Sequence, residues 1–297
     1  MLRRMTHIFA VLLLLWVTGS AQTTNPSTAS SAFAGDIDQI TAGKTSAERG
    51  KAIQNSLKAM GIEFKTEDFT APSRAGKEVK GTNIIATIPN AKARKTIMIG
   101  AHLDRVGVGV GAIDNASGSA AVLELLRAFK AKPLQNVTIV AGFWDQEEVG
   151  LVGSREFVKS REKGGLPNVY INFDVYGAGD VIWLWSADEN AEFAKNFKGA
   201  ATAAKYGFLI SKDYPPSDHR SFAVPGVESF SFSLGPANEA ANIIRVLKHE
   251  QVDQANFPKV LQIIHTPNDT VEKVDSNAAV KSLVVVEAAI RTLDKDK

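Results

Sequence analysis

Near-continuous apolar runs alternate in this chain with segments of helical periodicity, and this alternation constrains the fold more than any other feature. Strand-like runs occur at residues 82–89, 96–104, 136–145, 168–174, 181–185 and 227–234. Helical segments are expected at residues 116–131, 154–164, 190–205 and 277–293. Strands that are apolar throughout are typical of parallel sheets covered on both faces. The sequence therefore predicts an α/β fold, a single domain with a mostly parallel central β-sheet flanked by helices on both faces.

The N-terminus has the pattern of an export signal. A basic stretch at residues 1–7 precedes an apolar run at 8–17, which is short for a membrane span, and small residues follow around Ala21. We expect residues 1–21 to be a signal peptide and the protein to be exported, either periplasmic or extracellular; an uncleaved N-terminal anchor is the alternative. Residues 22–44 are small and polar and are expected to be a flexible segment. The folded domain is expected over residues 45–297, beginning with a helix at the capping-box pair Thr45 and Glu48.

Composition and charge exclude several classes of site and partner. The chain has no cysteine, which rules out disulfides, a lipoprotein anchor on cysteine and cysteine-based catalysis. The formal net charge is +2 and falls to zero without Arg3 and Arg4 of the signal peptide. We therefore expect no nucleic-acid partner, no membrane partner after cleavage, and a monomer.

Acidic and imidazole groups recur where predicted strands end. His102 and Asp104 close one run, Glu147 and Glu148 follow another, and Asp174 ends a third. In open α/β sheets, ligands bind at the carboxyl ends of the strands. Three strand ends that carry polar groups to the same edge of the sheet indicate a ligand-binding site.

Each of these groups also has an ordinary structural explanation. Asp114 precedes a helix and could be its N-cap, and adjacent glutamates such as Glu147 and Glu148 are common on solvated surfaces. His102 and Asp104 are two apart, so in a strand they share a face, where the carboxylate could orient a metal-bound imidazole. His265 opens the loop "HTPNDT". Taken together, two histidines and three carboxylates make a plausible nitrogen and oxygen ligand set for paired zinc ions, with Glu147 left free as a base.

The ordered motifs resemble those of a known family. The matching segments are "GAHLD", "GAIDNASGSAAVLEL", "EEVGLVGS", "INFD", "YPPSDHRSF" and "HTPNDT", and they run from about residue 80 to the C-terminus. As an ordered set they resemble the co-catalytic di-zinc aminopeptidases, which include secreted bacterial leucine aminopeptidases and are related to glutamate carboxypeptidase and glutaminyl cyclase. Residues 45–297 would then be a zinc peptidase catalytic domain.

The resemblance implies a role for each motif. Asp114 would bridge two zinc ions, with His102 and Asp174 completing one site and Glu148 and His265 the other. Three further residues would act in catalysis: Glu147 as general base, Asp104 as partner of His102, and Tyr214 as stabiliser of the oxyanion. Asp218 and His219 would support the cleft. The resemblance also implies a cis peptide bond between Asp114 and Asn115.

The expected activity is hydrolysis of the N-terminal peptide bond of a peptide substrate. A single-zinc glutaminyl cyclase and a non-catalytic, peptidase-like binding module are the alternatives. The ligand pair His102 and Asp174 favours two ions and hydrolysis over the cyclase. Aminopeptidase is preferred to carboxypeptidase or dipeptidase only because no arginine cluster suited to a terminal carboxylate stands out.

Overall fold

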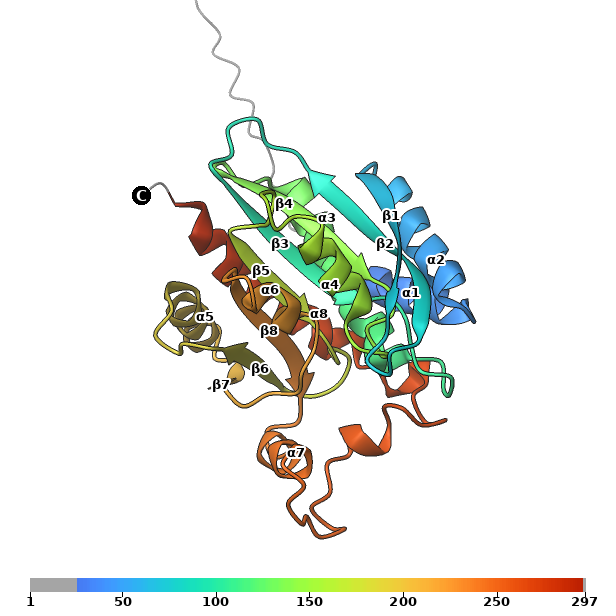
Figure 1. Cartoon of the computed structure of the whole chain (residues 1–297). Coiled ribbons are helices and arrows are strands. Elements are labelled where there is room, and N and C mark those ends of the chain that lie inside the picture. Colours follow the sequence, from blue (N-terminus) through green and yellow to red (C-terminus); the bar gives the residue numbers. More distant parts are fainter. Residues whose placement is uncertain (1–25, 296–297) are drawn as a thin grey trace, which may run out of the picture.

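The computed structural model describes residues 26–295 and contains one eight-stranded sheet, in the order β1-β2-β4-β3-β5-β8-β6-β7 (Figure 1). The strands are β1 (Glu63–Pro72), β2 (Glu78–Ile88), β3 (Lys95–His102), β4 (Val137–Trp144), β5 (Val169–Phe173), β6 (Val181–Ser186), β7 (Gly207–Ser211) and β8 (Glu228–Gly235). The four central strands β4, β3, β5 and β8 are mutually parallel. Antiparallel pairings join β2 to β4 on one side and β6 to β8 on the other. The predicted α/β fold with a mostly parallel sheet is confirmed.

Helices cover both faces of the sheet. They are α1 (Pro26–Ala42), α2 (Ser46–Ala59), α3 (Ser117–Ala131), α4 (Val152–Lys159), α5 (Glu192–Ala203), α6 (His219–Ala223), α7 (Ala240–Leu247) and α8 (Ser276–Arg291). Helices α4 and α6 lie in front of the sheet in Figure 1, and α8 lies behind it. The front cluster includes Trp144, Phe157 of α4 and Phe222 of α6, all buried.

The main core lies on the opposite face. It joins the sheet to α1, α2, α3, α5 and α8. One face of α3 is buried there, with Val122, Leu125, Leu126 and Phe129 at most 1% exposed. Because both faces of the central strands are covered, their backbones are fixed, and the loops at their carboxyl ends start from a rigid base.

Helix α1 corrects the prediction that residues 22–44 are flexible. Residues 26–42 are helical, and Phe33, Ile37 and Ile40 are buried in the main core with 0%, 0% and 1% exposure. These three side chains lie at helical spacing on one face, and their burial outweighs the small and polar residues around them. Helix α2 begins as predicted, with both hydrogen bonds of the Thr45–Glu48 capping box present. The predicted signal peptide, residues 1–21, lies outside the described residues.

The first part of the segment between β8 and α8 projects beyond the end of the sheet. It carries α7 and the short helix η2 (Val260–Gln262), and Figure 1 shows α7 at the lower end of the molecule. Within residues 26–295, no helix is both long and apolar enough to cross a membrane.

Candidate metal centre

Three adjacent parallel strands bring polar groups to one edge of the sheet. Strand β3 ends at His102, and Asp174 directly follows β5. Glu147 and Glu148 come just after the end of β4 at Trp144. Because β4, β3 and β5 are neighbours and parallel, these side chains reach a common point, as the sequence predicted.

Two further residues reach this point from connecting segments. Asp114 lies in the short turn η1 (Ala112–Ala116), which leads into α3. His265 lies in the loop after η2 and has a positive φ of 58°. The peptide bond between Asp114 and Asn115 is cis, as the family resemblance implied.

Asp114 is shared between two groups of possible ligands. Its Oδ1 lies 3.2 Å from Nε2 of His102, and its Oδ2 lies 3.0 Å from Nε2 of His265. Asp174 completes the first group and Glu148 the second, and in each group the ligand atoms lie within 4.8 Å of one another. One carboxylate thus presents a separate oxygen to each group.

The composition and polarity of these groups fit divalent cations. Imidazole nitrogen and carboxylate oxygen are ligands that zinc prefers. Oε1 of Glu148 and Oδ1 of Asp174 are buried and have no hydrogen-bond partner in the described part of the chain. The carboxylates also raise the pKa of both imidazoles: hydrogen bonds to Asp114 and Glu148 raise the pKa of His265 to about 10. The site therefore attracts positive charge, which metal ions would supply.

Asp104 connects His102 to the loop of the two glutamates. Its Oδ1 lies 3.3 Å from Nδ1 of His102 and accepts a hydrogen bond from the backbone N–H of Glu147 at 3.1 Å. Its Oδ2 accepts from the backbone N–H of Glu148 at 3.3 Å. With Nδ1 engaged in this way, Nε2 of His102 is left to face Asp114 and Asp174.

Glu147 belongs to neither ligand group but lines the same cavity. Burial raises the pKa of its carboxyl well above the usual range, while the neighbouring His102 opposes this shift. The Asp218 and Asp174 charges raise the pKa further. A carboxyl group in such surroundings is suited to proton transfer.

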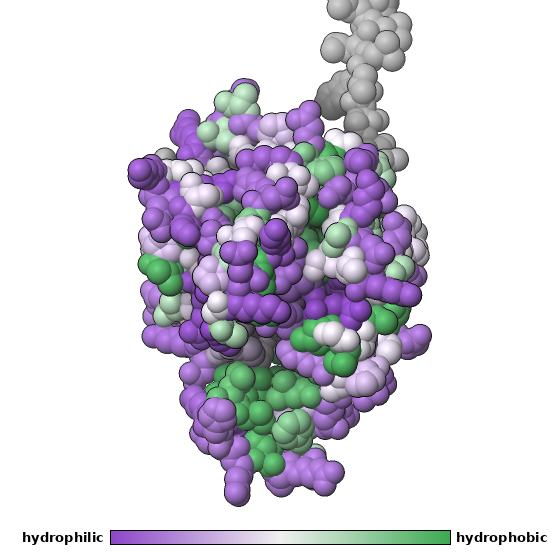
Figure 2. Space-filling model, turned by 45° about the vertical axis from the view of Figure 1, so that its right-hand side comes forward, coloured by the Kyte–Doolittle hydropathy of each residue, from purple (hydrophilic) through white to green (hydrophobic). Residues whose placement is uncertain are grey.

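The cavity beside these residues has about 400 Å³ of space and a largely apolar wall. Its apolar lining residues include Trp183, Leu209, Ile243, Leu247, Val260 and Leu261. Figure 2 shows apolar surface gathered at the lower end of the molecule, in the part that carries α7. The cleft therefore places an apolar pocket next to the charged groups.

Comparison with known proteins identifies the family. The profile described as peptidase family M28 matches residues 83–290, more than half of the chain. The chain belongs to peptidase family M28. The family predicted from the ordered motifs is thereby confirmed.

Individual known proteins share parts of the sequence or the fold. Leupeptin-inactivating enzyme 1 of Streptomyces exfoliatus is 36% identical over 130 residues, which cover 42% of this chain but only 28% of that protein. The structure of a leucine aminopeptidase precursor from Bacteroides thetaiotaomicron is similar with a TM-score of 0.71 at 19% identity, covering 92% of this chain and 98% of that one. The glutaminyl cyclase of an Acidobacteriales bacterium is similar with a TM-score of 0.69 at 21% identity, covering 89% and 94%. At these identities the two structures show a shared fold.

Tyr214 lines the cleft of the M28 domain, but its hydroxyl is engaged. It is hydrogen-bonded to Oγ of Ser233. Because Ser233 donates its own hydrogen to the carbonyl of Asp174 at 2.6 Å, Tyr214 is the donor in its bond with Ser233. The predicted contact with an oxyanion would require Tyr214 to give up this bond.

Asp269 was not assigned a role from the sequence, yet it fixes the turn that carries Asp114. Its carboxylate accepts hydrogen bonds from the backbone N–H groups of Ile113 at 2.7 Å and Asp114 at 3.2 Å. The residue stands in the same "HTPNDT" motif as His265. The motif thus provides a possible ligand and also holds a second one in place.

Asp218 and His219 are fully buried beside the M28 cleft. Burial raises the pKa of Asp218 to about 7 and lowers the pKa of His219 to about 3, so His219 is neutral. The His219 ring packs against Trp185 with 4.4 Å between ring centroids and against Tyr214 with 5.7 Å. His219 therefore packs against the residues around Tyr214.

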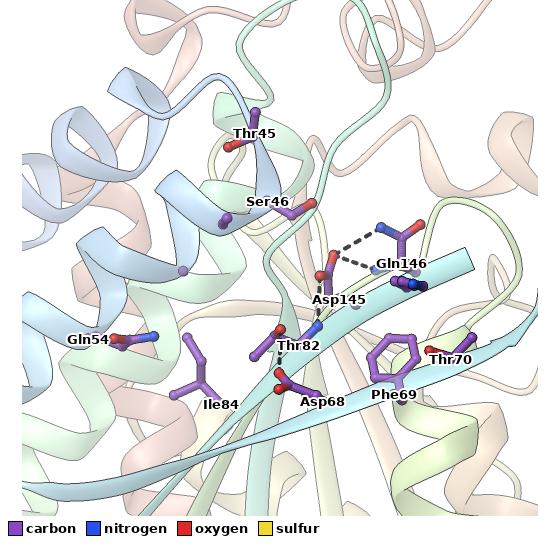
Figure 3. A pocket seen from close by; sticks show the side chains of 14 residues that line it. Thr45, Ser46, Gln54, Asp68, Phe69, Thr70, Thr82, Ile84, Asp145 and Gln146 are labelled. Atoms are coloured by element: carbon purple, nitrogen blue, oxygen red, sulfur yellow. Dashed lines mark hydrogen bonds between the residues drawn. The ribbon is translucent and has the colours of Figure 1, made fainter. Parts of the chain in front are cut away.

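A second cavity, of about 830 Å³, lies between α2, β1 and β2 (Figure 3). None of the residues of the two ligand groups lines it. Figure 3 shows Asp145 between Thr82 and Gln146, and its carboxylate accepts hydrogen bonds from their backbone N–H groups at 3.0 and 2.9 Å. Asp145 thus ties the start of the Glu147–Glu148 loop to β2.

Proposed function

We propose that this M28 chain is an exported metallo-aminopeptidase that hydrolyses the N-terminal peptide bond of peptides with two co-catalytic zinc ions. The observation that carries this proposal is the single carboxylate of Asp114, which offers one oxygen to each of two nitrogen and oxygen ligand groups. A site for one ion would need only one of these groups. Family membership and the leucine aminopeptidase-like fold support the same reading.

In this proposal each ion has its own ligands besides Asp114. His102 and Asp174 would hold one ion, and Glu148 and His265 would hold the other. When bound, such a pair of ions activates a water molecule and polarises the scissile carbonyl group of the substrate.

The protein side chains then move the proton and keep the ligands in place. Glu147 takes the proton from the attacking water on its carboxylate and gives it to the amine that departs. Asp104 orients His102 through Nδ1 and holds the backbone of Glu147 and Glu148. The Asp104 carboxylate thus orients His102 and also positions Glu147.

The apolar cavity supports a preference for an apolar first residue. Trp183, Ile243 and Leu247 line the cavity beside Asp174 and Glu147. Burial of an apolar side chain there is favourable by roughly 1.5–3 kcal/mol for a residue of leucine size. We therefore propose substrates whose N-terminal residue resembles leucine.

Export is proposed from the signal-like residues 1–21. Without cysteine, the mature chain could not be retained by a lipid on an N-terminal cysteine. N-terminal sequencing of the protein from its native host should begin near residue 22. An intact Met1 would reject the cleavage.

A peptide panel tests the proposed activity. Zinc-loaded enzyme should release leucine from a peptide with a free N-terminus and should not cleave the same peptide after N-acetylation. Cleavage of the blocked peptide alone, or release of the C-terminal residue, would reject the aminopeptidase assignment. A Gln-initiated peptide separates the cyclase, which forms pyroglutamyl product, from the peptidase, which releases glutamine. Inactivity on every peptide would favour the binding module.

A further inference from the structure

A buried arginine outside the ligand groups spans the loop between two of the predicted ligands. Arg49 lies on α2 and is 0% exposed. Its Nε donates to the carbonyl of Leu103 at 2.5 Å, Nη1 to that of Val110 at 2.9 Å and Nη2 to that of Gly111 at 3.2 Å. One guanidinium therefore binds both ends of the segment Leu103–Gly111.

This segment joins His102 to the turn with Asp114, and its own sequence cannot stiffen it. It reads "LDRVGVGVG", and Gly109 and Gly111 have positive φ values of 67° and 62°. Glycine gains freedom in the unfolded chain and loses it on ordering. Arg105 also binds the segment, but at its outer part, through the carbonyls of Val106 and Gly109.

The charge of Arg49 suits its surroundings. Burial lowers its pKa to about 10, while the carboxylates of Asp104, Asp114 and Asp269 oppose this shift. Arg49 thus stays protonated at neutral pH, and all three donor bonds persist. Asp269 holds the other side of the turn by accepting from Ile113 and Asp114.

We propose that Arg49 is a positioning residue, whose guanidinium fixes the Leu103–Gly111 segment so that Asp114 lies between His102 and His265. This inference rests on the proposed metal site. It assigns a function to α2, which contributes no residue to either ligand group. A planar fork with donors on three nitrogens is needed, because one ammonium group cannot span the same carbonyls.

The test compares Arg49→Lys and Arg49→Gln with the wild type and with Arg127→Lys. Arg127 is a suitable control because it is an arginine that is partly buried, pairs with Asp36 and Glu124, and lies in neither ligand group. We expect both Arg49 variants to bind zinc at least ~10-fold more weakly in chelator competition, as is typical when a ligand loses its support. In metal-free protein, amides of residues 105–114 should exchange hydrogen faster. Arg127→Lys should change neither quantity.

The outcomes separate this inference from the proposed function. Arg49→Lys retains charge and stem, so it keeps the test valid if Arg49→Gln does not fold. Wild-type zinc affinity and wild-type amide exchange in a folded Arg49→Lys variant would overturn the positioning role. A wild-type protein that binds no zinc would instead overturn the proposed function.

Discussion

Asp114 is the residue on which the proposed two-ion centre depends, because it alone among the described residues belongs to both ligand groups. In Asp114→Asn, an amide NH₂ replaces one carboxylate oxygen, and NH₂ cannot bind a cation. We expect the variant to lose at least one equivalent of zinc and peptidase activity to fall ~100-fold or more, beyond the usual effect of losing a supporting residue. Elemental analysis after dialysis measures the zinc.

The control is Asp68→Asn, at an exposed residue hydrogen-bonded to Thr82, and it should retain both zinc and activity. Full zinc occupancy in Asp114→Asn would contradict the bridging role.

Replacing Glu147 should lower activity without lowering zinc content, unlike replacing one of the proposed ligands. In Glu147→Gln the side chain keeps its size but can no longer accept the proton from water. We expect kcat to fall by ~10²–10⁴-fold while zinc content stays at the wild-type value. Steady-state kinetics with parallel metal analysis tests this, and loss of zinc together with activity would instead identify Glu147 as a ligand.

The position of a residue in the site was predictable where the residue belongs to a recognisable motif. Its role was not predictable where that role depends on a contact with a segment far away in the chain. The convergence of five side chains on one point was predictable because each stands at a strand end or in an ordered motif; they are His102, Asp114, Glu148, Asp174 and His265. Their role as metal ligands stays a proposal. The role of Asp269 depends on backbone N–H groups about 155 residues away in the chain. Likewise, the bond from Tyr214 to Ser233 depends on how the loop after β7 packs beside β8, although these two strands are not neighbours in the sheet.

Among the elements, α1 differs from the prediction because its few apolar residues stand within a small and polar segment. Phe33, Ile37 and Ile40 have helical spacing, but serine, threonine and glycine surround them. Because Phe33 is fully buried, Phe33→Ala should reduce the free energy of unfolding by about 3–5 kcal/mol. Chemical denaturation measures this loss. The exposed neighbour Gln39 provides the control Gln39→Ala, and equal stability of the two variants would show that α1 is not part of the core.

A substitution in helix α7 tests the proposed apolar pocket. Ile243 is buried in the cluster with Trp183 and Tyr214 and lines the cleft. We expect Ile243→Ser to lower kcat/KM for a leucine-initiated peptide by ~10–200-fold, the usual range for lost apolar contacts in a specificity pocket. An alanine-initiated peptide should be affected less. Val224→Ser changes a valine that is 87% exposed and should leave both substrates unaffected; an equal loss for both peptides in Ile243→Ser would contradict the pocket.

For the whole molecule, the proposed ligands come from segments far apart in the chain, so metal binding should stabilise the fold. A ligand that binds only the folded state adds about 2.7 kcal/mol at 100 times its Kd. Removal of metal by a chelator should therefore lower Tm, and added zinc should restore it. Scanning calorimetry of wild type and Asp114→Asn provides the comparison. A zinc-independent Tm in the wild type would contradict linkage between the site and the fold.

The architecture was predictable because its signals repeat along the chain. Six apolar runs and the helices between them indicated a mostly parallel sheet. The strand order β1-β2-β4-β3-β5-β8-β6-β7 was not predictable, because it depends on which strands pair in the sheet rather than on any local pattern. The edge strand β1 is largely exposed and has no continuous apolar run. The edge strand β7 is short, with three consecutive apolar residues at 208–210. Neither strand is predicted from the sequence.

If the Asp114 carboxylate bridges two metal ions, anomalous scattering at the zinc edge from crystals of zinc-loaded protein should reveal both. We expect two anomalous peaks on either side of Asp114, one beside His102 and Asp174 and the other beside Glu148 and His265. A single peak, or peaks away from Asp114, would disprove the bridging role.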